Sequence, residues 1–210
     1  MKPRPLPILI DTREQMPLAF PATLQASGRT WAITTRRATL STGDYSIDGH
    51  EGGKTGQRSG ICIERKQDLE ELAGCFTAGR ERFEREFARM ELYRVRIITV
   101  VGSRADIMGH RYRSRMVPQS LLASLDGWCE WFGVHVHFAP SRREMSDYIL
   151  QAMRRYLIRI ERIESDDTDE STAFDFLQSA PDGDQDHRRE TCPQRLPTGS
   201  PQGPENHDHR

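Results

Sequence analysis

The sequence predicts a single α/β domain with a mixed central sheet flanked by helices, followed by a disordered acidic tail. Two observations predict this arrangement. Residues 1–163 alternate between short apolar runs, typical of strands, and segments whose apolar residues recur every three or four positions, typical of helices. Beyond residue 163 this periodicity stops, and Asp, Glu, Ser, Pro and Gly dominate. We therefore expect a folded domain over residues 1–163 and a disordered tail over residues 164–210.

The first part of the domain is predicted to be mainly strand. Residues 12–29 indicate a loop or a short helix, because prolines and glycines interrupt them. Residues 48–60 carry five glycines and almost no apolar side chains, so we expect an exposed hairpin loop there. This loop would make the fourth strand antiparallel to the third. The four predicted strands cover residues 7–11, 31–40, 45–47 and 61–64.

The second part mixes helices and strands. Helical spacing of apolar residues begins at Asp68 and resumes after Gly79, which predicts two consecutive helices. Residues 95–101 (VRIITVV) form the most apolar predicted strand, and we expect them at the centre of the sheet. The remaining elements are a helix over 117–132, a strand over 134–138, and a last helix from Ser141 to about Arg162.

Charge is distributed unevenly along the chain. The formal net charge is −1, but residues 164–210 hold 12 acidic and 4 basic residues. Residues 1–163 hold 26 basic and 19 acidic residues. A basic folded part favours a polyanionic partner, because each neutralised phosphate releases counterions. Charge that merely keeps the protein in solution explains the same numbers equally well.

The cysteines and the apolar runs indicate the compartment. The four cysteines are scattered without a C-x-x-C pair, which argues against a disulfide framework or a zinc site and fits a reducing cytoplasm. No apolar run approaches the roughly 20 residues needed to cross a bilayer, and the N-terminus has no signal-peptide core. We expect a cytoplasmic protein without a membrane partner.

Two acids and a lysine mark the predicted site. Glu64 and Lys66 are two residues apart on a strand, so their side chains point to the same face, and a hairpin would bring Asp44 across from them. Two close carboxylates repel each other unless a divalent cation lies between them, and oxygen ligands of this kind suit Mg²⁺. Such a cation could polarise a phosphate, while Lys66 holds the attacking water or stabilises the growing charge. These parts suffice for phosphodiester hydrolysis.

The bare pattern is weak, since Glu64 and Lys66 alone are more typical of a solvated salt bridge. Three neighbouring motifs are more specific: Asp11-Thr12-Arg13-Glu14, Gly43-Asp44-Tyr45 and Glu64-Arg65-Lys66. In this order and at about this separation they resemble the nuclease domain of the XPF family of structure-selective endonucleases. The likeness covers roughly residues 7–140. It implies a variant of the restriction-endonuclease-like core and a metal-dependent endonuclease.

The resemblance implies roles for the matching residues. Asp44, Glu64 and Asp11 would bind Mg²⁺ or Mn²⁺, and Lys66 would be catalytic, with Glu14 and Arg65 completing the catalytic set. A further acid follows the Glu-Arg-Lys motif in the family, and here Asp68, Glu70 and Glu71 compete for that position. Arg13 would orient carboxylates or phosphate, and Arg80 would lie on a helix that faces the DNA. Apart from the resemblance, Arg36, Arg37 and Arg113 are further candidates for contacts with the phosphate backbone, although an ordinary solvated loop explains them equally well.

The chain departs from many XPF relatives, which carry a tandem helix-hairpin-helix module where this chain has its acidic tail. It resembles stand-alone bacterial or bacteriophage members, which implies the cytoplasm of a bacterial or phage-infected cell and a role in DNA repair, recombination or phage DNA processing. DNA is the expected partner, with a homodimer or another protein supplying further DNA contacts. Two alternatives stay open: a catalytically silent DNA-binding or scaffold subunit, and a hydrolase that acts on RNA or another phosphodiester.

Overall fold

The computed structural model describes residues 2–53 and 58–178, with the side chains of residues 166–178 left out of the description. The chain divides into two units, Met1–Asp167 and Thr168–Arg210, and the fold below is that of the first. Seven strands form one mixed sheet in the order β2-β3-β1-β4-β5-β6-β7. The mixed sheet flanked by helices is therefore confirmed.

The strands of the amino-terminal half form one side of the sheet. β1 pairs in parallel with β3 and antiparallel with β4, and β2 pairs antiparallel with β3. The predicted loop over residues 12–29 thus contains a strand, whose four residues pair with the start of β3. These strands are β1 (Arg4–Asp11), β2 (Thr23–Ala26), β3 (Arg29–Ala38) and β4 (Tyr45–Ile47).

The other side of the sheet is parallel, apart from its junction with β4. β5 is antiparallel to β4, as predicted, while β5, β6 and β7 run parallel to one another. β6 is an interior strand between β5 and β7, and β4 holds the middle position in the sheet, so the prediction that residues 95–101 form the central strand is wrong. An apolar run shows that a strand is covered on both faces but does not fix its position. These strands are β5 (Ile61–Lys66), β6 (Val95–Val101) and β7 (His135–Ala139).

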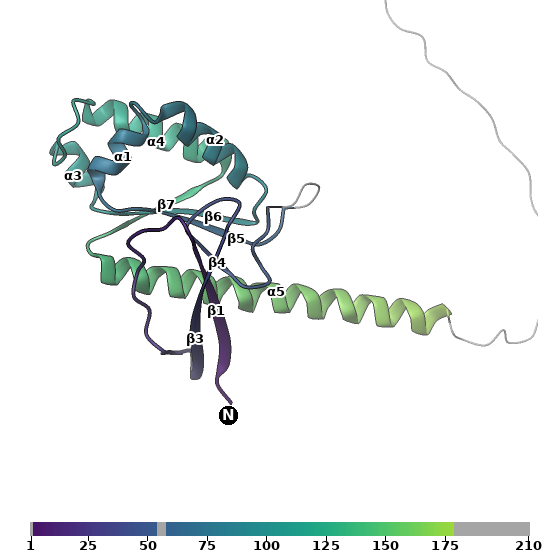
Figure 1. Cartoon of the computed structure of the whole chain (residues 1–210). Helices are drawn as coiled ribbons and strands as arrows, with labels where there is room; N and C mark the ends of the chain where they lie inside the picture. Colours follow the sequence, from purple (N-terminus) through teal and green to yellow (C-terminus); the bar gives the residue numbers. More distant parts are fainter. Residues whose placement is uncertain (1, 54–57, 179–210) are drawn as a thin grey trace, which may run out of the picture. The chain divides into compact units, whose positions relative to one another are not determined.

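Helices cover both faces of the sheet (Figure 1). α1, α2, α3 and α4 pack on one face, and α5 packs on the other, so the apolar core lies in two layers. Ser103 caps α3, a short helix that the sequence analysis missed. The five helices are α1 (Leu69–Cys75), α2 (Arg80–Met90), α3 (Arg104–Met108), α4 (Pro118–Phe132) and α5 (Arg142–Gln178). No helix among the described residues is both long and apolar enough to cross a membrane.

α5 extends further than predicted. It was expected to end near Arg162, with disorder from residue 164, but it continues to Gln178. Residues 164–178 contain no proline or glycine, so a helix already formed by its packed first turns can add one hydrogen bond per residue. The last helix is therefore longer than predicted, and the rest of the predicted disordered tail, residues 179–210, lies outside the described residues.

Candidate active site

Glu64 and Lys66 meet at the carboxyl end of β5. Their side chains leave the strand on the same face, toward α2. Lys66 Nζ donates a 2.5 Å hydrogen bond to Glu64 Oε1 and lies 4.7 Å from the centre of the Phe83 ring. Glu64 is 6% exposed and Lys66 is 4% exposed. The pair is therefore buried, unlike the solvated salt bridge that was the plainer interpretation of the sequence.

Asp44 reaches this pair through the turn that precedes β4. Its backbone N–H donates to the carbonyl of Ile63 at 2.8 Å. Its carboxylate oxygen Oδ2 accepts a hydrogen bond from the backbone N–H of Arg65, also at 2.8 Å. Both bonds hold Asp44 against β5, so the expected proximity of Asp44 to the Glu-Arg-Lys motif is present in the structure.

Gly43 makes this turn possible. It has a φ of +79°, and an added Cβ would lie 2.6 Å from Cys62 Sγ and 3.0 Å from the carbonyl oxygen of Ile63. We expect Gly43→Ala to destabilise the protein by more than the roughly 1–2 kcal/mol that left-handed backbone costs a non-glycine residue. Gly49 has a φ of +81° and open space around it, so Gly49→Ala is the matched control for the backbone alone. If urea unfolding showed that Gly43→Ala and Gly49→Ala lose the same free energy of unfolding, the close approach of Gly43 to Cys62 and Ile63 would have no role.

A third carboxylate, Glu86, joins the site from α2. The charges of Glu64, Lys66 and Asp44 all act on its carboxyl group. The sequence analysis missed it. Glu86 follows Phe83 by three residues and precedes Phe87, and both phenylalanines are fully buried. An acid on the apolar face of a helix was the signal that could have found it.

Burial and excess negative charge together set the electrostatics of this cluster. Burial, followed by the charge of Glu64, raises the pKa of Asp44 to about 8. The same two causes raise the pKa of Glu86 to about 8. Burial alone would lower the pKa of Lys66, but the charges of Glu64 and Glu86 outweigh it and the pKa of Lys66 is raised. Three acids thus share one ammonium group, and the lysine stays protonated.

Asp11 lies next to this cluster, and each of its carboxylate oxygens already accepts two hydrogen bonds. Its two carboxylate oxygens accept hydrogen bonds from the backbone N–H, Nε and Nη2 of Arg13 and from the backbone N–H of Leu40, at 2.7 to 3.0 Å. Burial would raise the pKa of Asp11, but these hydrogen bonds lower it overall. Four bonds use both lone pairs of each oxygen. Asp11 therefore orients Arg13 in this structure, and its role as a metal ligand stays a prediction.

Glu14 forms a buried ion pair with Arg65. The Arg65 Nε and Nη2 atoms donate to the two carboxylate oxygens of Glu14 at 2.8 and 3.0 Å. Both side chains are under 10% exposed. The pKa of Glu14 is lowered, since its bonds to Arg65 outweigh burial, which would raise it. Arg65 thus links two predicted residues, because its side chain binds Glu14 and its backbone N–H binds Asp44.

The five arginines predicted to contact DNA have different environments. Arg13 lies near the charges of Asp44 and Glu64, and its side chain is 67% exposed. Arg37 donates from Nη1 to the backbone carbonyls of Asp11 and Glu14, which gives it a structural role. Of the others, Arg36 pairs with Asp48, Arg80 lies over the ring of Trp128, and Arg113 is exposed on the loop before α4.

The acids after the Glu-Arg-Lys motif have separate structural roles. Asp68 caps α1 by accepting from the backbone N–H of Glu71, whose own carboxylate accepts from Gln67 N–H. Glu70 Oε2 accepts from the backbone N–H of Arg113 at 2.5 Å and from that of Ser114. Glu70 therefore anchors the basic loop before α4, and none of these hydrogen bonds places Asp68, Glu70 or Glu71 in the catalytic cluster.

The donor chemistry of the cluster suits a hard divalent cation. No three described His, Cys, Asp or Glu side chains already stand in a metal-binding arrangement. Asp44, Glu64 and Glu86 nevertheless offer carboxylate oxygens against a single lysine. Mg²⁺ is usually held by one or two carboxylates and keeps several waters, so it needs no complete protein cage. In ligand chemistry, these residues fit Mg²⁺ or Mn²⁺.

Comparison with known proteins places the chain in a family. A model of the ERCC4 domain matches residues 10–152. No curated protein matches the chain. Among solved structures, XPF from Aeropyrum pernix is similar at 19% identity and a TM-score of 0.47, over 71% of this chain and 60% of that chain. A complex of the same protein with DNA is similar at 19% identity and a TM-score of 0.49, over 73% of this chain and 66% of that chain. The matched part spans less than two thirds of those XPF chains.

Fold and site together define an α/β nuclease domain, with acids and a lysine gathered at the carboxyl end of a buried strand. Because the family model covers more than half of the sequence, the chain belongs to the ERCC4 domain family. The resemblance drawn from the three short motifs is thereby confirmed.

Proposed function

We propose that this protein is a metal-dependent endonuclease that hydrolyses phosphodiester bonds in DNA. The observation that carries the proposal is the convergence of Asp44, Glu64 and Glu86 around Lys66 in a member of the ERCC4 domain family. A cluster that serves structure alone would balance its charges. Here three carboxyl groups face a single ammonium group, and burial together with the charge of Glu64 raises the pKa values of Asp44 and Glu86, which favours a cation there.

Asp44 and Glu64 would hold the metal ion, with Glu86 beside them. When bound, Mg²⁺ or Mn²⁺ supplies Lewis-acid polarisation of a phosphate oxygen and a more acidic water. Lys66 stays protonated, so its role is to donate hydrogen bonds to the phosphate oxygens as negative charge grows on them, rather than to accept a proton. Water adds to phosphorus and one P–O ester bond breaks, which leaves a phosphate on one side and a hydroxyl on the other.

The exposed arginines near the cluster would position the nucleic acid. Arg13 is held by Asp11 close to the catalytic carboxylates, with two thirds of its side chain exposed. Its guanidinium group is therefore oriented before DNA binds, which suits phosphate recognition. Arg113 lies on the loop that Glu70 anchors next to α1. These two arginines are the predicted DNA contacts that the structure favours most.

Metal dependence is the first test. Purified full-length protein is incubated with single-stranded, forked, flapped and four-way DNA in Mg²⁺, in Mn²⁺ and in chelator. We expect cleavage of at least one substrate with either metal and none in chelator. Equal cleavage in chelator would contradict the proposed metal dependence.

Two alternatives are separated by the same experiment. A scaffold subunit would bind the DNA panel without cutting it under any metal condition. Both motifs that such a subunit would be expected to lose, Gly43-Asp44 and Glu64-Arg65-Lys66, are intact. An RNA hydrolase would cut matched RNA strands faster than DNA. Light scattering of the DNA complex would count subunits and test the proposed homodimer.

A further inference from the structure

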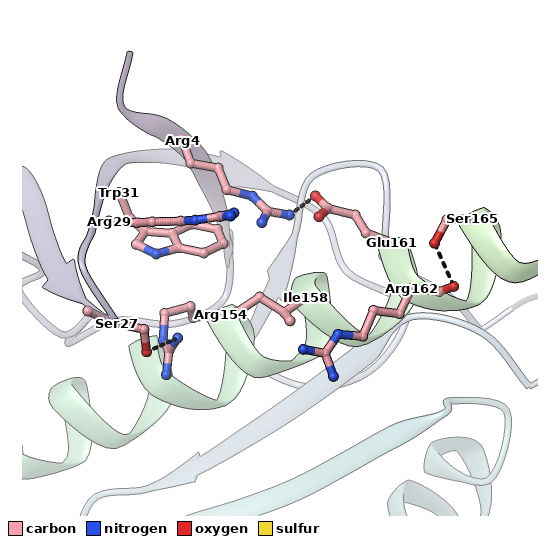
Figure 2. Close-up of a pocket in the computed structure, with 10 residues that line it drawn as sticks. Arg4, Ser27, Arg29, Trp31, Arg154, Ile158, Glu161, Arg162 and Ser165 are labelled. Atoms are coloured by element: carbon pink, nitrogen blue, oxygen red, sulfur yellow. Dashed lines mark hydrogen bonds and ion pairs between the residues drawn. The ribbon is translucent and has the colours of Figure 1, made fainter. Parts of the chain in front are cut away.

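A basic cavity lies at the opposite end of β1 from the candidate active site (Figure 2). Its volume is about 640 Å³. The start of β1, the β2–β3 turn and one side of α5 form its walls, and none of the candidate catalytic residues lines it. Figure 2 shows Arg4 and Arg29 beside the indole of Trp31, with Arg154 and Arg162 extending from α5.

The described lining of this cavity is strongly positive. It contains four arginines, Arg4, Arg29, Arg154 and Arg162, but a single acid, Glu161. Arg4 forms an ion pair with Glu161 and packs on the Trp31 ring, 4.5 Å from its centre. The other three arginines form no ion pair with any residue that the structure describes. Three positive charges are therefore left for a ligand.

Two further observations favour an anion. Trp31 is 1% exposed, and its indole Nε1–H has no hydrogen-bond acceptor among the described residues. Buried donors of this kind nearly always have a partner. Burial and the charge of Arg29 both lower the pKa of Arg4, so the arginines repel one another as they stand. An oxyanion would supply the missing acceptor and relieve this repulsion, and guanidinium groups match phosphate oxygens in geometry.

We propose that this cavity binds backbone phosphates of the same DNA molecule whose cleavage we assign to the Asp44–Glu64–Lys66 site. The inference rests on the proposed function and extends it. β1 runs from Arg4 at the cavity to Asp11 beside the active site. From Arg4 to Asp11 the strand advances by seven residues at roughly 3.3 Å each, so its two ends lie roughly 23 Å apart. At about 3.4 Å per nucleotide, the bound phosphate lies about seven or more nucleotides from the scissile bond.

The test measures DNA binding as a function of length, in chelator so that nothing is cut. The variant is Arg29→Gln/Arg162→Gln, since both side chains are exposed and lie outside the apolar core. On a duplex of about 20 base pairs we expect weaker binding and a salt dependence (log K against log[salt]) shallower by about 2, one for each lost phosphate contact. On a duplex of about six base pairs, too short to span both sites, we expect no change.

Arg143→Gln/Arg159→Gln is the matched control, because it also removes two exposed positive charges, both from α5, but leaves the cavity lining intact. Three results would overturn the proposal and leave the nuclease assignment unaffected. They are an equal loss of DNA affinity in the control variant, a loss of affinity for the short duplex as well, and an unchanged salt dependence of binding to the long duplex. If the wild-type protein bound no DNA of either length, both the proposed phosphate site and the proposed nuclease function would be contradicted.

The indole N–H resonance of Trp31 gives a second measurement. The long duplex should shift it in a ¹H–¹⁵N spectrum, and the short duplex should not. Inorganic phosphate and a mononucleotide are the competing ligands of the same chemistry. A shift with either of these but not with the long duplex would identify a site for a small anion and overturn the assignment to DNA.

Discussion

Replacing Asp44 by asparagine is expected to lower the cleavage rate on the order of 10²–10³-fold, with little change in DNA binding. The amide oxygen can still accept the hydrogen bond from the Arg65 N–H, so the turn before β4 keeps its shape. What disappears is one of the carboxylates available to a divalent cation. The measurement is the single-turnover rate on the best substrate from the panel, with binding followed by fluorescence anisotropy in chelator.

Asp48→Asn is the matched control for this variant. Asp48 is an exposed acid four residues further along the chain, paired with Arg36 at the surface. Its replacement should leave the cleavage rate within a factor of about two, because exposed pairs contribute little. Wild-type cleavage by Asp44→Asn would remove Asp44 from the catalytic set.

The same substitution is expected to stabilise the metal-free protein at high pH. The pKa of Asp44 is raised by burial and by Glu64 to about 8 in the folded protein, from an ordinary value of 3.8. The folded state therefore holds a proton that the unfolded state has lost, and stability falls as the pH rises from about 4 through about 8. An asparagine cannot lose that proton. Urea unfolding near pH 5 and near pH 9 measures the change: the free energy of unfolding should fall less between these two pH values for Asp44→Asn than for the wild type.

Replacing Glu14 by alanine is expected to destabilise the protein by about 3–5 kcal/mol. The guanidinium group of Arg65 is 7% exposed and binds Glu14 through two hydrogen bonds, so the variant leaves a buried positive charge without its partner. Urea unfolding at neutral pH measures the change. Cleavage should fall as well, because Arg65 also donates its backbone N–H to Asp44.

The surface pair of Arg36 and Asp48 is the control for this second prediction. Its donor–acceptor distance is 2.8 Å, the same as that between Arg65 Nε and Glu14 Oε2, but both side chains are more than 40% exposed. Asp48→Ala should therefore change stability by no more than about 1 kcal/mol. A double variant, Glu14→Leu/Arg65→Met, should recover part of the loss, since no charge is then left buried. Equal effects of Glu14→Ala and Asp48→Ala would show that burial is not the deciding factor.

Much of the fold could be predicted from the sequence because apolar periodicity reports which face of an element is covered. The helices around Phe83 and Leu125 and the strands around Ile63 and Ile98 follow from it directly. The strand Thr23–Ala26 could not be predicted, since it is short, partly exposed and formed by its pairing with β3. The continuation of α5 was missed because its acidic sequence shows no helical repeat of apolar residues.

The site was predictable where its residues are close in sequence or belong to short motifs. Glu64 and Lys66 share a strand face, and Asp44 follows the glycine turn that faces them. The roles of Asp11 and Glu14 depended on which arginine lies nearest in three dimensions, and the sequence does not contain that information. Glu86 comes from a different element altogether and needed the packing of α2 to reveal it.

Because side chains alternate between the two faces of β5, this strand should not tolerate the insertion or deletion of a single residue. Cys62, Glu64 and Lys66 face the α1–α4 layer, while Ile61, Ile63 and Arg65 face the α5 layer. Inserting or deleting a single codon within this strand would exchange the two sets, driving two charges into the apolar layer and two isoleucines into the catalytic cluster. Point substitutions can remove activity and stability separately, but a change of length in β5 would remove both at once.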